Sequence, residues 1–98
     1  MLAEGADFVV GVDTHVRRHA FAIIDARTGA LLAEWKESAC AAGYESALAR
    51  CRKLAVGARL WALEGTGSYG AGLARHLAAA GESVREVERP QRRVARGG

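Results

Sequence analysis

The sequence predicts an α/β fold in which one mixed five-stranded sheet carries two helices. Three observations support this prediction. Three strand-like segments follow one another through short connections, the rest of the chain alternates helical and strand patterns, and two apolar strands each end in a carboxylate at a turn. The 98 residues make up one small domain.

The first part of the chain predicts an antiparallel meander. An unbroken apolar run predicts a strand over residues 7–12, and a second strand follows over residues 19–25. The segment Ala26-Arg27-Thr28-Gly29 is typical of a turn, and Gly29 suits a positive φ. It leads into a third strand over residues 30–37. Strands joined by such short connections pair antiparallel.

The rest of the chain alternates helices with strands. A helix is predicted over residues 41–56, because Tyr44, Leu48, Cys51 and Leu54 recur at helical spacing and form one apolar face. A strand follows over residues 59–64. A second helix is predicted over residues 69–80, with Ser68 as its cap. Glycines at positions 70 and 72 indicate either close backbone packing or the close approach of a ligand near its first turn. Residues 83–88 form the last predicted strand.

The predicted order is β-β-β-α-β-α-β. Strands separated by helices become parallel through right-handed crossovers, which places the fourth strand beside the first and the fifth outside it. This is the ribonuclease H-like plan with its final helix missing. We expect residues 1–88 to form this domain and residues 89–98 to form a basic tail.

Charge and composition exclude several classes of protein. The net charge is +3, and the whole excess lies in residues 85–98. This end suits a phosphate backbone, although a solvated terminus has the same composition. The two cysteines form no CxxC pair, so redox chemistry is not implied, and Cys51 is expected to be a buried free thiol. No apolar run is long enough to span a membrane, which makes a cytoplasmic protein the expectation. The candidate nucleic-acid-binding residues are Arg89, Arg92, Arg93 and Arg96.

Asp13 and Glu64 are the candidate catalytic and metal-binding residues. If their strands are parallel neighbours, the two carboxylates meet at the carboxyl edge of the sheet, where open α/β sheets build their sites. Carboxylate oxygens suit Mg²⁺ or Mn²⁺. Alone, Asp13 could be a turn residue, and Glu64 could accept hydrogen bonds from the amides of the turn Gly65-Thr66-Gly67-Ser68, which leads into a helix N-terminus. Zinc is disfavoured, because His15 and His19 lack a third ligand with suitable spacing.

Several segments together resemble the N-terminal, RuvC-like domain of DEDD-type insertion-sequence transposases of bacteria, the group that includes the Piv invertase. They are Val10-Gly11-Val12-Asp13-Thr14-His15, the turn at 25–29, Ala41-Ala42-Gly43-Tyr44, Glu64-Gly65-Thr66-Gly67-Ser68-Tyr69-Gly70 and Val87-Glu88-Arg89-Pro90. The similarity spans nearly the whole chain. The segment EGTGSYG is the specific part of it.

The resemblance implies Mg²⁺-dependent strand cleavage and exchange in DNA transposition or recombination, with a guide RNA in some members. Asp13 and Glu64 would be the first two acids of the family's tetrad. The third and fourth acids, and the C-terminal domain that supplies a nucleophilic serine, are not found within these 98 residues. We therefore expect a truncated transposase fragment that is inactive, or nearly so, alone, and that binds Mg²⁺ weakly or not at all.

Two other functions stay open at this stage. The chain could be a non-catalytic remnant that binds nucleic acid through its basic tail, or that interacts with full-length transposase or with a second copy of itself. It could also be the first lobe of an actin-like ATPase, which shares this strand order. The segment after Asp13 contains no glycine, however, and a phosphate-binding hairpin requires one.

Overall fold

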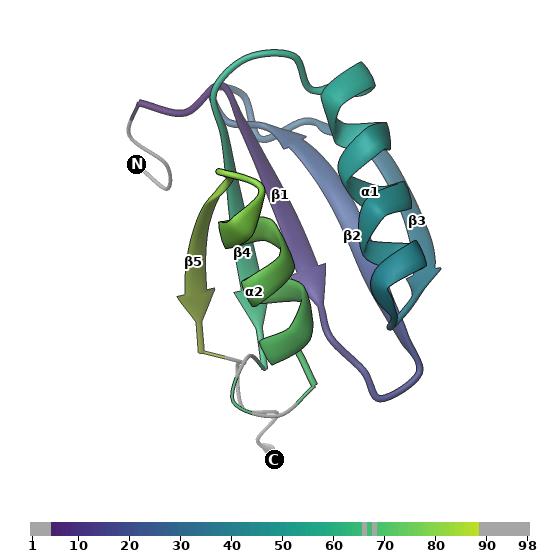
Figure 1. The fold of residues 1–98 in the computed structure, drawn as a ribbon. Helices are drawn as coiled ribbons and strands as arrows, with labels where there is room; N and C mark the ends of the chain where they lie inside the picture. The colour runs from purple at the N-terminus through teal and green to yellow at the C-terminus, as the bar shows by residue number, and fades with distance from the viewer. Residues whose placement is uncertain (1–4, 66, 68, 89–98) are drawn as a thin grey trace.

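The computed structural model describes residues 5–65, 67 and 69–88, and these form a two-layer α/β domain (Figure 1). In chain order the elements are β1 (Phe8–Asp13), β2 (Arg18–Asp25), β3 (Leu31–Ser38), α1 (Ala41–Leu54), β4 (Arg59–Glu64), α2 (Ala71–Ala79) and β5 (Ser83–Val87). The predicted element order is confirmed, and the ends of the strands differ from the prediction by at most one residue.

The five strands form one sheet in the order β3-β2-β1-β4-β5. The first three strands pair antiparallel, whereas β4 is parallel to both β1 and β5. This is the predicted arrangement, and it follows from connection length. A short loop reverses the chain, while a connection containing a helix returns it to the same end of the sheet.

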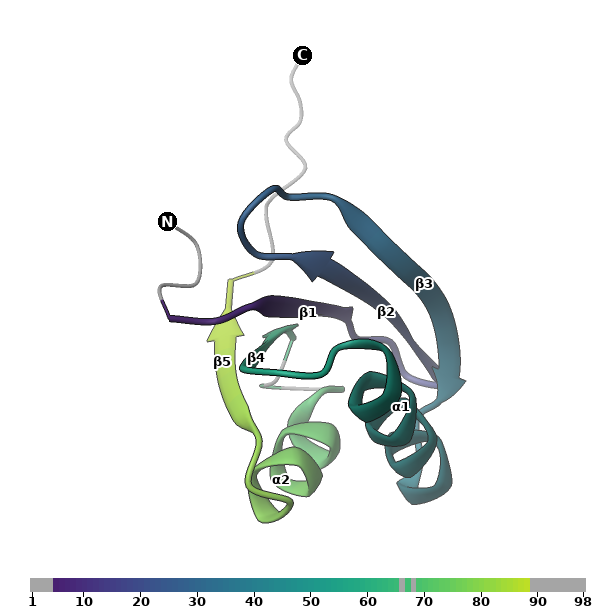
Figure 2. The same ribbon diagram turned by 90° about the horizontal axis from the view of Figure 1, so that it is seen from above.

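Both helices cover the same face of the sheet, as Figure 2 shows. The core lies between the two layers, where apolar side chains of the central strands meet those of the helices. Among the largest fully buried side chains are Phe21, Leu48, Trp61, Leu73 and Leu77. Within the described residues no element covers the opposite face, which we call the open face of the sheet.

The buried face of α1 differs from the prediction at its end. Leu48 and Cys51 are buried as expected, but the side chain of Leu54 is 49% exposed and Ala55 is fully buried in its place. The helix ends at Leu54, two residues before the predicted end. Because the helix ends there, Ala55 and not Leu54 packs into the core after Cys51. Cys51 is a free thiol, and its burial raises its pKa to about 12.

The second helix begins at Ala71, two residues later than predicted, and Gly70 occupies the N-cap position that was predicted for Ser68. Gly65 adopts φ +75°, and its carbonyl accepts a hydrogen bond from the N–H of Gly70 at 3.0 Å. Tyr69 and Gly70, which the sequence pattern assigned to the helix, therefore precede it. The expected close packing is present, because a Cβ on Gly72 would lie 2.9 Å from the Tyr44 hydroxyl.

Candidate functional site

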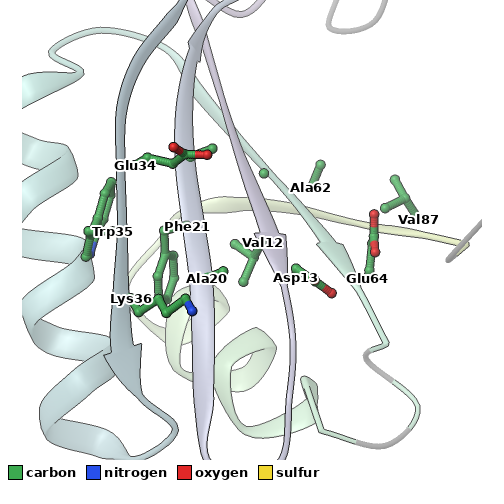
Figure 3. Close-up of a pocket in the computed structure, with 12 residues that line it drawn as sticks. Val12, Asp13, Ala20, Phe21, Glu34, Trp35, Lys36, Ala62, Glu64 and Val87 are labelled. Atoms are coloured by element: carbon green, nitrogen blue, oxygen red, sulfur yellow. The ribbon is translucent and has the colours of Figure 1, made fainter.

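Asp13 and Glu64 lie side by side at the ends of the two central parallel strands. Each is the last residue of its strand, and the register of β1 with β4 pairs the two residues directly. Register partners on neighbouring strands point to the same face of a sheet. Both residues line a hollow of about 700 Å³ on the open face (Figure 3). The structure therefore brings together the two acids that the sequence singled out.

The floor of this hollow is made of small side chains. Gly11, Ala20, Ala22 and Ala62 lie on the central strands, and they leave the sheet surface low between larger residues. Across the strands, Lys36, Ala20, Asp13 and Glu64 form one continuous row of register partners (Figure 3). The acid pair thus lies at the edge of an open, shallow surface.

Thr14 ties the two strand ends together. Its side chain is fully buried, and its hydroxyl donates a hydrogen bond to the backbone carbonyl of Glu64 at 2.5 Å. This bond joins the residue that follows the first acid to the second acid. Sequence reasoning did not single out Thr14. The available signal was a hydroxyl directly after an apolar strand and its terminal acid.

Asp13 has a partner in the loop that follows it. The Nε2 atom of His15 lies 3.1 Å from Oδ2 of Asp13, and both side chains are about half exposed. The backbone N–H of His15 in turn donates to Nδ1 of the buried His19 at 3.2 Å. Burial lowers the pKa of His19, and the neighbouring His15 lowers it further. A neutral His19 is therefore the acceptor that orients this loop.

The two histidines near Asp13 lie in different surroundings. His15 lies in the loop between β1 and β2, not on a strand with His19, and His19 points into the core among the aromatic rings of Phe21 and Tyr44. No group of three or more His, Cys, Asp or Glu side chains able to hold a metal occurs in the described part of the chain.

The remaining predicted site residues lie partly outside the described structure. Thr66 and Ser68 of the turn, and Arg89, Arg92, Arg93 and Arg96 of the basic tail, are among the residues that the structure does not describe. Gly65 lies at the carboxyl end of β4, and the exposed Gly67 follows it in the connection to α2.

The donor set of the acid pair fits Mg²⁺ or Mn²⁺. Two carboxylates on one face, beside an open surface, match the way in which Mg²⁺ is held by one or two protein carboxylates together with water and substrate phosphates. The side chain of Asp13 is 50% exposed, so a hydrated ion can reach it. A divalent ion at this edge would neutralise the two adjacent carboxylates, and it would polarise a phosphate oxygen of a bound ligand.

No protein-family model matches the sequence, and no curated protein matches it. Solved structures do match the fold. The large terminase nuclease from thermophilic phage G20c superposes with a TM-score of 0.58 at 18% identity, over 87% of this chain and 46% of that one. The fowlpox virus Holliday junction resolvase superposes with a TM-score of 0.54, also at 18% identity, over 83% of this chain and 60% of that one.

The fold is ribonuclease H-like. The likeness covers most of this chain but only about half of the two neighbours, so the 98 residues correspond to part of their length. At such low identity the similarity concerns the fold, and the chemistry of the site must be argued from its residues. None of the helices in the described part of the chain has the length and apolar character that crossing a membrane requires.

Proposed function

We propose that this chain is a fragment of the ribonuclease H-like domain of a DEDD-type DNA transposase or recombinase. Asp13 and Glu64 supply the first two carboxylates of its metal site. The observation that carries the proposal is the register of β1 with β4, which places these acids next to each other on the open face. The fold supports the proposal, since the two superposed structures are a terminase nuclease and a Holliday junction resolvase.

The proposed substrate is the phosphodiester backbone of DNA. The shallow floor of small residues lets a strand approach the acids from the open face. Metal ions held by carboxylates stabilise charge on the attacking and leaving oxygens in phosphodiester chemistry. A full DEDD site has four acids, and two of them are present here. We therefore expect these 98 residues alone to cleave DNA weakly or not at all.

Metal titration tests the acid pair directly. Mn²⁺ binding is measured by electron paramagnetic resonance for the wild type and for Asp13→Asn, Glu64→Gln and Glu86→Gln. Glu86 is an exposed carboxylate on β5 and serves as the matched control. We expect both site variants to weaken Mn²⁺ binding by at least about tenfold and the control to leave it unchanged. Equal binding by all four proteins would refute the metal site.

The alternative of a non-catalytic binding protein makes a different prediction. It attributes DNA affinity to the basic tail, and it requires neither acid. Incubation of supercoiled plasmid with the chain and Mg²⁺ separates the two functions. Nicking that Asp13→Ala abolishes would show that the chain retains catalysis. Weak metal binding without nicking is the result expected here, and absence of both would favour the binding function. A guide RNA, full-length transposase and a second copy of the chain remain proposed partners.

A further inference from the structure

A second hollow, of about 470 Å³, adjoins the acid pair, and cations dominate its lining. Its lining includes Asp13, His15, Val16, Arg17, Arg18 and Lys36. Asp13, Ala20 and Lys36 line both this hollow and the larger one on the open face. The two hollows are therefore parts of one continuous surface. We call the second hollow the basic hollow.

Strand pairing determines the positions of Arg18 and Lys36 in the basic hollow. Ala20 on β2 is the register partner of Lys36 on β3, and Arg18 lies two residues before Ala20. Alternation along β2 places Arg18 on the same face as Ala20, so Arg18 and Lys36 are diagonal neighbours across the two strands. Both cations are therefore presented on the open face.

Arg17 belongs to a loop that is anchored twice. The carbonyl of Arg17 accepts a hydrogen bond from the N–H of Ala39 at 2.8 Å, and the N–H of His15 donates to buried His19 at 3.2 Å. A loop held at two points presents its side chains from a constant position. Ligand binding then requires less ordering of the backbone.

Charge balance in the basic hollow favours an anion. Among the residues that the structure describes, Arg17, Arg18 and Lys36 form no ion pair, whereas Arg27 and Arg59 each pair with an acid. The one carboxylate in the lining is Asp13, which already contacts His15. Three exposed cations around one hollow create a positive potential that attracts a solvated polyanion.

We propose that the basic hollow binds the sugar-phosphate backbone of a DNA strand. Arg17, Arg18 and Lys36 contact phosphates that neighbour the one placed at Asp13 and Glu64. The position of the reacting phosphate rests on the function proposed above, while the binding of the backbone does not. The continuity of the two hollows favours an extended strand over a small anion, since a single phosphate would occupy just one of them.

Fluorescence anisotropy with a labelled single-stranded DNA 20-mer, in EDTA and over a range of salt concentrations, tests this proposal. The triple variant Arg17→Ala/Arg18→Ala/Lys36→Ala is compared with Arg52→Ala/Lys53→Ala/Arg75→Ala. The control removes the same charge from exposed positions on the two helices. Circular dichroism confirms that both triple variants are folded. For single strands, each lost phosphate contact reduces the magnitude of the slope of log affinity against log salt concentration by about 0.7. The Arg17→Ala/Arg18→Ala/Lys36→Ala variant should therefore have a slope smaller by about 2.

The outcomes are distinct. A smaller slope for the basic-hollow variant, with the control slope unchanged, supports the proposal. Equal slopes for the two triples, or no binding by the wild type at low salt, overturn it. Inorganic phosphate that displaces the DNA at millimolar concentration would also overturn it, because it would indicate a site for a small anion. Because EDTA removes divalent ions, the anisotropy measurement does not depend on the metal site, so failure of that site in the Mn²⁺ titration would not count against this inference.

Discussion

Replacement of Glu82 by Gln should remove a large part of the stability of this domain. Glu82 lies just before β5, and its side chain is 9% exposed. Its carboxylate accepts hydrogen bonds from Nε and Nη2 of Arg59 at 3.1 and 2.8 Å and from the indole N–H of Trp61 at 2.8 Å. Arg59 also donates to the carbonyl of Ala55, after α1. The pair of Glu82 and Arg59 therefore joins three segments of the chain.

The expected magnitude follows from this burial. Gln keeps the shape and one acceptor oxygen, but it leaves the buried guanidinium of Arg59 without a counter-charge. Removal of one partner of a buried pair costs about 3 to 5 kcal/mol, and we expect the lower end of this range, about 3 kcal/mol, because an acceptor remains. A 98-residue domain has a free energy of unfolding of about 5 to 15 kcal/mol. The melting temperature should fall by about 12 to 24 °C.

Urea denaturation at pH 7, followed by tryptophan fluorescence, measures this loss. Glu86→Gln is the matched control, since it makes the same chemical change on an exposed residue of β5. A loss below about 1 kcal/mol for Glu82→Gln would refute the reasoning, because it would place the pair among ordinary surface ion pairs. Arg59→Met with Glu82→Gln should cost less than the sum of the single changes.

The same carboxylate predicts a pH dependence. Hydrogen bonds from Arg59 lower the pKa of Glu82 below its ordinary value of 4.5. Between 4.5 and the lowered pKa the unfolded chain binds more protons than the folded one, so the free energy of unfolding falls with falling pH. This contribution is fully present above pH 4.5. The free energy of unfolding of Glu82→Gln should therefore fall less steeply with decreasing pH than that of the wild type. Urea denaturation at several pH values between 3 and 6 measures this difference.

Two further predictions concern Thr14 and the cysteines. Thr14→Val removes the hydroxyl bond to the Glu64 carbonyl and should cost about 1 kcal/mol, whereas Thr14→Ser keeps it. If Thr14 positions the acids, Thr14→Val should also weaken Mn²⁺ binding, and a change in stability alone would limit it to a structural role. Exposed Cys40 should react with a thiol reagent at pH 8 within minutes, while Cys51 should react at the rate of unfolding. Rapid labelling of both cysteines in the native protein would contradict the buried position of Cys51.

The sequence predicts the sheet well, because its topology depends on features that are local. Apolar runs mark the strands, and the length of each connection decides whether neighbours are parallel or antiparallel. The position of Asp13 beside Glu64 follows from the same argument, since both acids end strands that a helix separates. The start of α2 was predicted two residues too early, because Gly70, a poor helix former, occupies the N-cap position and not a position inside the helix.

The surroundings of the acid pair could not be predicted in the same way. The bond from Thr14 reaches a carbonyl 50 residues away, and the hydroxyl gives no sign of its partner in the sequence. The basic hollow combines Arg17 and Arg18 with Lys36, which lies on the next strand. Strand register decides this contact, and a shift of one residue would turn Lys36 to the other face. Such features require the folded structure.

The pairing of β1 with β4 also has a consequence for the order of folding. These strands are central in the sheet, yet the ladder between them joins segments about 50 residues apart, while β1, β2 and β3 pair through short loops. Contacts at long sequence separation form slowly, because loop closure must come first. Asp13 and Glu64 therefore meet only once this ladder closes. A cation held between them would cross-link the slowest contact of the sheet, so it should slow unfolding and leave the rate of folding nearly unchanged.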